Sequence, residues 1–491
     1  MFETAELGRK VSKTDYEAVV PALRVDLLNA QYDLRRADFS VLILLAGDDH
    51  HGCNEILELL HEWMDARYME TQVFGLPTDE ERDRPRFWRY WRSQPRRGRI
   101  GIYMGAWALA AVADQVTHRI NDTEFQRRVT HARNFEEALN NDGVLVLKYW
   151  IHLPHKEHQK RRKQAKKSGP PLRVDDADWK VLEKYSKAMP VVQHYLRKTT
   201  TDRAPWHVVE GTNRNHRNLE VARLLREALT TRLGRDAAPP RRTRRKSPPS
   251  ADGPTLLDEI DLTLALEHDA YRKRLDKLQA RLYRLSFEAR EAGIAAVIVL
   301  EGWDAAGKGG VIRRITAALD ARDYRVVPIA APTEEEKARH YLWRFWTRLP
   351  RDGSMLLFDR SWYGRVLVER VEGFARPDEW ARAYEEINDF EEQLVEHGVL
   401  LLKFWLHIDP DEQLRRFRER EKTPFKKYKL TDDDYRNREK WPIYARAVSD
   451  MVERTSTEIA PWHLIAANNK RWARVRVVET LVQGLKNRLG S

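Results

Sequence analysis

Short apolar runs alternate with segments in which apolar residues recur at helical spacing, most clearly in the second half of the chain. Continuous apolar runs of this length predict buried strands. The predicted strands are 294–300, 325–330, 354–358, 398–406 and 462–466. The helical spacing predicts one or two helices over 256–290 and single helices over 311–319, 333–347, 378–397, 411–421, 432–455 and 471–488. Strands that alternate with helices predict a parallel sheet covered on both faces, which binds ligands at the carboxyl ends of its strands.

The first half of the chain repeats the second at a spacing of 255 residues, which separates Gly52 from Gly307. The matched segments include Phe39–Leu45 with Ile294–Leu300 and, after a slip of one residue, Ala204–His207 with Ala460–His463. Solenoid repeats are only roughly 20–50 residues long, so a repeat of this length indicates a duplicated domain.

A segment that cannot form a core joins the two halves. Residues 235–255 combine prolines with arginines and lysines and contain no large apolar side chain, a composition typical of linkers. We therefore predict a degenerate domain at 1–234, a basic linker at 235–255 and a second domain at 256–491. The basic run of the linker is either a solvated tether or a contact for a polyanion.

The strongest chemical signal follows the first predicted strand of the second half. Gly302–Lys308 fits the pattern G-x-x-x-x-G-K, with an apolar strand before it and a helical pattern after it, which is the context that a phosphate-binding loop requires. Glycines let backbone N–H groups approach phosphate oxygens, and the helix N-terminus adds positive potential. Gly309 occupies the position at which most such loops carry a magnesium-binding Ser or Thr, so carboxylates such as Asp304 would have to hold the metal.

A second group of polar residues follows the predicted strand 354–358. Asp359 occupies the place where nucleotide-hydrolysing folds put their second magnesium carboxylate, and Arg360 can neutralise charge on a moving phosphoryl group. The alternative for Asp359 is a helix N-cap.

The duplication provides a comparison within one chain, because residues kept in both halves can serve the fold alone. The residues opposite Lys308, Asp359 and Arg360 are Cys53, Met104 and Gly105. The first half therefore lacks the lysine, the carboxylate and the arginine, and we predict that it does not transfer phosphate. Asp304 faces Asp49, so this comparison supports a catalytic role for Asp304 less strongly.

Composition and charge limit the classes of partner. The chain has 491 residues, 42% apolar residues, one cysteine and a formal net charge of +12. Its first residues do not resemble a signal peptide, no apolar run reaches the ~18 residues of a membrane span, and a single cysteine is typical of the cytoplasm. The positive charge favours an anionic partner, although an arginine-rich genome would produce the same excess. The cation-rich segment 415–429 is interpreted either as a mobile lid or as a solvated helix face.

These motifs resemble those of the type 2 polyphosphate kinase family. The resemblance rests on Gly302–Gly310, Asp359–Tyr363, Phe404–His407 with Glu412-Gln413 and Arg416-Phe417, and Ala460–His463. It implies a P-loop kinase-like three-layer α/β/α fold with a parallel sheet, duplicated in tandem, each copy with a helical lid. The doubled arrangement is similar to that of the two-domain members, which are typically polyphosphate:AMP phosphotransferases.

The resemblance also implies roles for individual residues. The implied catalytic residues are Asp304, Lys308, Asp359 and Arg360, of which Asp304 and Asp359 hold Mg²⁺. The implied phosphate-binding residues are Gly302, Ala305, Ala306, Gly307, Gly309, Gly310, Arg416 and Arg420. The implied nucleotide-binding residues are Tyr363 and Glu369, and Gly364 stands where many single-domain members carry Asn.

We therefore expect a cytoplasmic, magnesium-dependent enzyme that moves the terminal phosphoryl group of inorganic polyphosphate to AMP. The alternatives are transfer to ADP, an ATP-dependent nucleoside monophosphate kinase, and a non-catalytic polyanion-binding module. The expected partners are polyphosphate and AMP or ADP, without nucleic acid or membrane, and a homo-oligomer is left open.

Overall fold

The computed structural model describes residues 2–167, 184–236, 255–424 and 432–490. The predicted linker therefore lies largely outside the described residues, as do Lys426, Lys427 and Lys429. Contacts between Cα atoms divide the chain into unit 1 (Met1–Thr78, Arg89–Thr243 and Thr333–Trp343) and unit 2 (Asp79–Trp88, Arg244–Pro332 and Arg344–Ser491). Among the described residues, no helix is long and apolar enough to span a bilayer.

Each half of the sequence alternates strands with helices. The first half contains η1 (Glu3–Ala5), α1 (Lys13–Leu34), β1 (Val41–Gly47), α2 (His50–Trp63), η2 (Ala66–Tyr68), β2 (Met69–Val73), α3 (Asp79–Arg82), α4 (Trp88–Arg92), β3 (Ile100–Met104), α5 (Trp107–Val116), α6 (Asp122–Asn141), β4 (Leu145–His152), α7 (His155–Lys167), α9 (Tyr185–Thr199), β5 (Trp206–Glu210) and α10 (Arg214–Asp236).

The second half contains η3 (Leu256–Glu259), α11 (His268–Glu291), β6 (Ala296–Gly302), α12 (Lys308–Thr316), β7 (Tyr324–Pro328), α13 (Glu334–Lys337), α14 (Trp343–Trp346), β8 (Met355–Asp359), η4 (Trp362–Arg365), α15 (Val368–Val371), α16 (Pro377–His397), β9 (Leu400–His407), α17 (Pro410–Glu421), α18 (Asp432–Glu439), α19 (Trp441–Thr455), β10 (Trp462–Ala466) and α20 (Lys470–Leu489).

The two sheets have the same topology. Their strand orders are β2-β3-β1-β4-β5 and, read in the matching direction, β7-β8-β6-β9-β10, and every strand pair is parallel. The register pairs Leu45 with Met104 in the first sheet and Leu300 with Asp359 in the second, so the strand ends correspond as the sequence repeat predicts. The duplicated α/β fold is confirmed.

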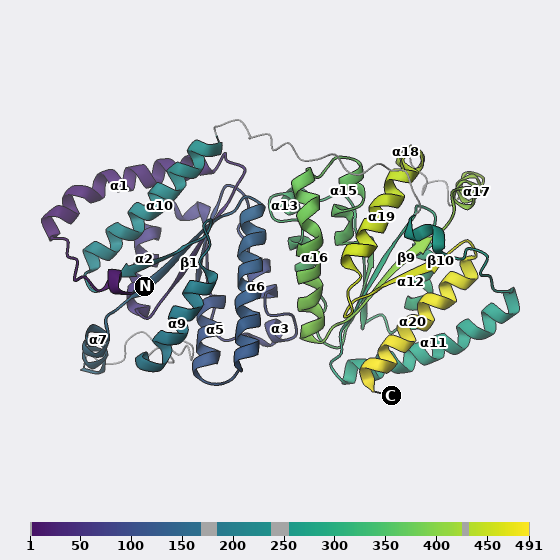
Figure 1. Cartoon of the computed structure of the whole chain (residues 1–491), viewed down its shortest axis with the longest axis horizontal. Helices are drawn as coiled ribbons and strands as arrows, with labels where there is room; N and C mark the ends of the chain where they lie inside the picture. Colours follow the sequence, from purple (N-terminus) through teal and green to yellow (C-terminus); the bar gives the residue numbers. More distant parts are fainter. Residues whose placement is uncertain (1, 168–183, 237–254, 425–431, 491) are drawn as a thin grey trace. The chain divides into compact units, whose positions relative to one another are not determined.

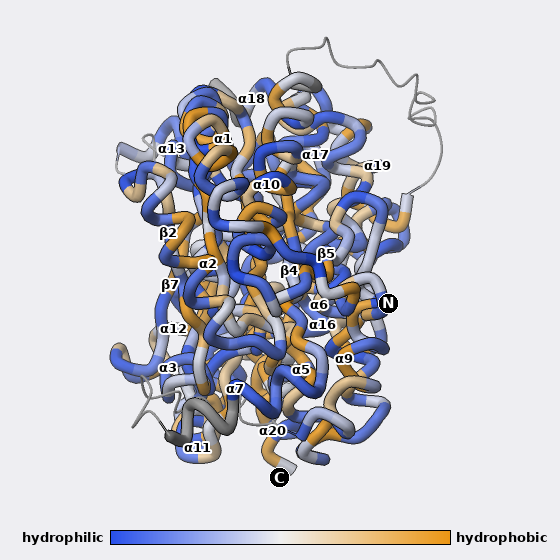
Figure 2. The backbone as a smooth tube through the Cα atoms, turned by 90° about the vertical axis from the view of Figure 1, so that its left-hand side faces the viewer, coloured by the Kyte–Doolittle hydropathy of each residue, from blue (hydrophilic) through white to orange (hydrophobic). Residues whose placement is uncertain are grey.

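Helices cover both faces of each sheet. In the second half, α16 and α19 lie on one side of the sheet and α11 and α20 on the other (Figure 1). Hydrophobic and hydrophilic stretches alternate along the chain (Figure 2), as expected for elements that are buried on one face only. The central strand β6 is buried from Ala296 to Glu301, which explains its continuous apolar run.

Two predicted helices are interrupted. The segment 333–347 begins with the expected capping box of Thr333 and Glu336, but it then breaks, because the His340 ring accepts a hydrogen bond from the Leu342 N–H at 3.2 Å and the chain turns there. The segment 432–455 is divided at Lys440, between α18 and α19. The ring of Pro442 disfavours continuous helical geometry in the residues before it.

A buried ion pair is repeated in both units. In unit 2, the Lys403 ammonium donates to Glu391 at 2.6 Å, to the Thr455 carbonyl at 2.7 Å and to the Tyr363 hydroxyl at 3.0 Å. In unit 1, the equivalent lysine, on β4, donates to Glu136 at 2.7 Å and to the Thr199 carbonyl at 2.6 Å. Because both units keep the pair, we interpret it as part of the fold.

Candidate active site

The predicted phosphate loop lies between β6 and α12. Gly302 has a φ of +143°, and a Cβ there would come within 2.5 Å of the Leu406 carbonyl oxygen, so only glycine fits. Gly307, with a φ of +118°, precedes the first residue of α12, and Ala305 has a φ of +64°. The first N–H groups of a helix have no partner inside the helix, and the loop therefore presents them to any bound anion.

The loop forms one wall of a cleft of about 500 Å³. The strand-end residues Asp359 and Arg360 line the same cleft, together with Asp304 and Lys308. The structure therefore brings together all four residues that the sequence predicted as catalytic. Arg420 also lines the cleft, and so does Arg416.

Two charged side chains of the cleft donate hydrogen bonds to the phosphate loop. Arg360 donates to Asp304 at 2.9 Å, and Lys308 donates to the Gly302 carbonyl at 2.6 Å. Burial and then the nearby Arg360 lower the pKa of Lys308, while the surrounding carboxylates oppose this shift. The lysine therefore contacts its own loop, from which it can turn to an anion.

Several cleft residues were missed by the sequence reasoning. Arg313, Lys470 and Arg474 line the cleft. At the repeat spacing, Arg313 faces Glu58 and Arg474 faces Asn218, so a comparison of every cation between the two halves would have detected both. Lys470 faces Arg214 and would have escaped that comparison.

A buried carboxylate, Glu301, was also missed. It accepts a hydrogen bond from Ser361 at 2.8 Å, and burial raises the pKa of its carboxyl group. Its counterpart in the first half is Ala46, so the same comparison would have indicated it.

A second, mostly apolar hollow adjoins the cleft. Trp303, Trp405, Leu367 and Tyr444 line it, and it shares Trp303, Asp304 and Arg360 with the cleft. The Trp303 ring stacks on Trp441, with centroids 3.6 Å apart and an interplanar angle of 11°. Aromatic walls of this kind suit a flat ring system.

The two predicted nucleotide-binding residues lie elsewhere. Tyr363 is fully buried, and its hydroxyl donates to Glu391 at 2.6 Å within the network of Lys403. Glu369 forms an ion pair with Arg365 at 3.2 Å, and burial raises the pKa of Glu369. Neither residue is among those that line the cleft or the aromatic hollow.

At the equivalent place in the first half, between β1 and α2, the described residues form no comparable loop. Helix α2 begins at His50, the counterpart of Ala305, and so begins three residues earlier than α12. Asp49 caps α2, accepting from the Gly52 N–H at 3.0 Å and from Arg161 at 2.7 Å. The Asp49 carboxylate therefore occupies the N-terminus of α2, at the position where a phosphate loop would bind an anion. Cys53, the counterpart of Lys308, is buried, which raises its thiol pKa.

We expect unit 1 to bind no phosphate chain. Calorimetric titration with tripolyphosphate should show one equivalent bound per full-length chain, because the Asp49 carboxylate and the early start of α2 leave no anion cradle between β1 and α2. In a Lys308→Ala/Arg474→Ala variant, binding should fall without exposing a second weaker site. Two equivalents per wild-type chain would contradict this expectation.

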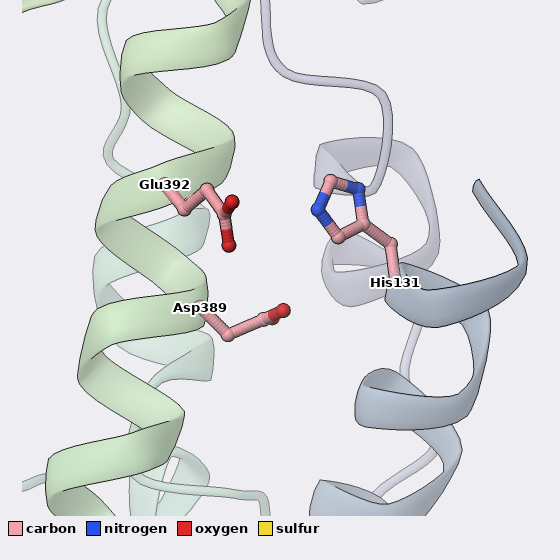
Figure 3. A group of neighbouring side chains, drawn as sticks. All are labelled: His131, Asp389 and Glu392. Atoms are coloured by element: carbon pink, nitrogen blue, oxygen red, sulfur yellow. The ribbon is translucent and has the colours of Figure 1, made fainter. Parts of the chain in front are cut away.

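One further group of side chains carries no assignment. Asp389 and Glu392 project from the same side of α16 in unit 2, and His131 lies on α6 of unit 1 (Figure 3). Within α16, Asp389 accepts a hydrogen bond from Gln393 at 2.8 Å. These side chains belong to separate units, and we assign them no metal site.

Comparisons with known proteins agree with the geometry of the loop. Residues 10–236 and 265–490 match the family Polyphosphate kinase 2 (PPK2). The polyphosphate:AMP phosphotransferase of Pseudomonas syringae pv. tomato is 48% identical over 99% of this chain and 98% of its own length. That of Acinetobacter johnsonii is 38% identical over 94% and 96%. A Pseudomonas aeruginosa PA01 crystal structure described as polyphosphate kinase 2 aligns over the whole of both chains, with a TM-score of 0.89 and 46% identity. This chain therefore belongs to the polyphosphate kinase 2 family.

Proposed function

We propose that this chain transfers the terminal phosphoryl group of inorganic polyphosphate to AMP and so produces ADP. The observation that carries the proposal is the cleft of unit 2, in which seven cationic side chains surround a phosphate loop. Relatives that match nearly the whole chain are named polyphosphate:AMP phosphotransferases.

The cations of the cleft suit the donor. A phosphate chain carries about one negative charge per unit, and a row of lysines and arginines binds such a polymer by releasing its counterions. Arg313, Arg420, Lys470 and Arg474 extend the positive lining beyond the loop. A single nucleoside triphosphate would need fewer of these charges, which favours polyphosphate over ATP as the donor.

The transfer needs positioning and neutralisation of charge more than covalent help. An oxygen of the AMP phosphate forms a bond to the terminal phosphorus, and the bond from that phosphorus to its bridging oxygen breaks. The polymer, one unit shorter, keeps the electron pair. Lys308 and Arg360 can stabilise the charge on the moving group, because both line the cleft beside the loop.

A divalent metal ion fits the same site. Polyphosphate kinases of this family generally need one, and we propose Mg²⁺. Asp304 and Asp359 offer carboxylate oxygens at the cleft, and Mg²⁺ typically takes one or two carboxylates together with substrate phosphates and water. When bound, the ion would neutralise charge between neighbouring phosphates.

The aromatic hollow is the proposed site of the acceptor base. It adjoins the cleft through Trp303, Asp304 and Arg360, so a nucleotide whose base lies there has its phosphate near Arg360. We further propose that the reaction is cytoplasmic, because the one cysteine is buried and forms no disulfide within the chain, and such cysteine usage is typical of that compartment.

Analysis of the products tests the proposal. Purified protein is incubated with Mg²⁺ and either polyphosphate or ATP as the donor, and with either AMP or ADP as the acceptor. Phosphorus NMR and chromatography should show ADP formed from AMP at the expense of polyphosphate. Faster turnover with ATP as the donor would favour a nucleoside monophosphate kinase, ATP formed faster from ADP would change the acceptor, and binding without turnover would leave a polyanion-binding module.

Arg420 provides a test of donor binding. Arg420→Ala should raise the KM for polyphosphate and reduce the slope of log KM against log salt concentration by about 1, as expected for one lost phosphate contact. The KM for AMP should change less. Arg418→Ala on the same helix is the matched control, because Arg418 is exposed and does not line the cleft. Equal salt slopes in the wild type, Arg420→Ala and Arg418→Ala would show that Arg420 does not contact the polymer and belongs to a solvated helix face.

A further inference from the structure

The guanidinium group of Arg416 makes all of its hydrogen bonds inside the protein. The side chain is 2% exposed. Its Nε donates to Glu412 at 2.5 Å, and its two Nη atoms donate to four carbonyl oxygens: those of Ala305 at 2.9 Å, Ala306 at 2.8 Å, Ala467 at 2.6 Å and Asn468 at 2.9 Å. An arginine has five N–H donors. All five are therefore used, and none remains for a phosphate.

These bonds hold the phosphate loop in an unusual conformation. The Asp304 carbonyl also accepts from α17, through Gln413 at 3.1 Å, so three successive loop carbonyls face this helix. In a trans peptide, the carbonyl points opposite to the N–H of the next residue. The N–H groups of Ala305 and Gly307 are therefore turned away from α17. Both residues have a positive φ, which is unfavourable for alanine.

The first half shows the same arginine with a different loop. Arg161 is the counterpart of Arg416 at the repeat spacing. It donates to the carbonyl of Gly211 at 2.9 Å, just as Arg416 donates to the equivalent Ala467. On its other side, however, Arg161 binds the Asp49 carboxylate instead of loop carbonyls, and the loop positions there are helical. The anchor is retained, and the open loop is found only where the carbonyl contacts exist.

We propose that Arg416 is a positioning residue that keeps the phosphate loop open by pulling its carbonyls onto α17. It does not bind the phosphate chain itself. Through this contact, α17 fixes the loop N–H groups that receive the transferring phosphate. The inference rests on the proposed function for its kinetic part, whereas its structural part concerns the protein without substrate.

The kinetic test separates positioning from binding of the polymer. Arg416→Lys cannot reach four carbonyls with one ammonium, and we expect its kcat to fall about 10²-fold or more, as for other losses of preorganised N–H donors. Its polyphosphate KM and salt slope should stay close to those of the wild type, unlike those of Arg420→Ala. Added guanidinium ion should partly rescue Arg416→Ala. A raised KM and a flattened salt slope with unchanged kcat would overturn the proposal.

The structural test uses hydrogen exchange of the protein without ligand. Peptides that cover 302–310 should exchange faster in Arg416→Lys and in the milder Gln413→Ala than in the wild type, while β9 and α16 remain protected. Arg418→Ala is the control on the same helix. Wild-type exchange in both variants overturns the inference even if the enzyme is active. An inactive wild-type enzyme with faster loop exchange in the variants overturns only the proposed function.

Discussion

Replacement of Lys308 by alanine should lower the rate of phosphoryl transfer by about 10²–10³-fold, the usual cost of removing one charge-stabilising group from a preorganised site. Lys308 lies at the first turn of α12 and lines the cleft together with Arg360. It is the one lysine within the loop residues 302–310, all of which the structure describes. The loss should appear in kcat more than in KM, because the charge that the lysine stabilises grows as the bond to the leaving phosphate breaks.

Asp359→Asn is the companion variant, because it removes a charge and keeps the shape. We expect a loss of similar size, together with a higher Mg²⁺ requirement. Circular dichroism should confirm that both variants are folded, and Arg418→Ala again controls for a general effect of charge. Turnover within about threefold of the wild type in either variant would contradict the assignment of the site, since a lost transition-state contact costs far more.

Replacement of Lys403 by methionine should cost about 3–5 kcal/mol of unfolding free energy, because it leaves the Glu391 carboxylate buried without its cation. Glu391 is 1% exposed, and burial already raises the pKa of this carboxyl group, while Lys403 and Tyr363 lower it. The lysine therefore permits the glutamate to remain charged inside the core.

The double variant Lys403→Met/Glu391→Gln provides the matched control. Glutamine can still accept from Trp362 and Tyr363, which donate to Glu391 at 3.0 and 2.6 Å in the wild type, and it leaves no buried charge. Denaturant unfolding should find the double variant more stable than Lys403→Met alone. If the single variant lost less than about 1 kcal/mol, the pair would contribute no more than a surface ion pair.

The sign of the pH dependence follows from the same pair. The pKa of Glu391 is raised in the folded state. Its ionisation therefore opposes folding above its unfolded pKa, and this penalty grows until the pH passes the folded pKa. Lys403→Met removes a cation that limits the shift, so the variant should gain stability relative to the wild type as the pH is lowered toward 5.

The fold could be predicted from sequence because two periodicities and one repeat agree. Continuous apolar runs mark strands that are buried on both faces, and the spacing of 255 residues carries each prediction from one half to the other. The break in 333–347 could not be predicted, because it depends on the ring of His340 and not on a glycine or proline.

Only part of the candidate site could be predicted from the sequence, because tertiary packing sets the partners of several of its side chains. Lys308 and Asp359 lie at or just after strand ends, and their counterparts Cys53 and Met104 cannot do the same chemistry, so position and residue type agree. Tyr363 ends the motif Asp359–Tyr363 that carries the family resemblance, but its hydroxyl turns into the core toward Glu391, a direction that only tertiary packing sets. Arg416 belongs to a cation-rich run, and the sequence cannot show that its partners are carbonyls.

The early start of α2 also has an evolutionary consequence: it makes the loss of phosphate binding in the first copy difficult to reverse. A lysine at position 53 would be buried in a helix that has no loop before it. Removal of the Asp49 carboxylate alone would uncap α2 and remove the acidic partner of Arg161, and a lost cap costs about 1 kcal/mol. Each single step back is destabilising before any step restores a ligand. Mutations that preserve the packing of the first copy can therefore accumulate, but neither of these single substitutions restores phosphate binding without first lowering stability.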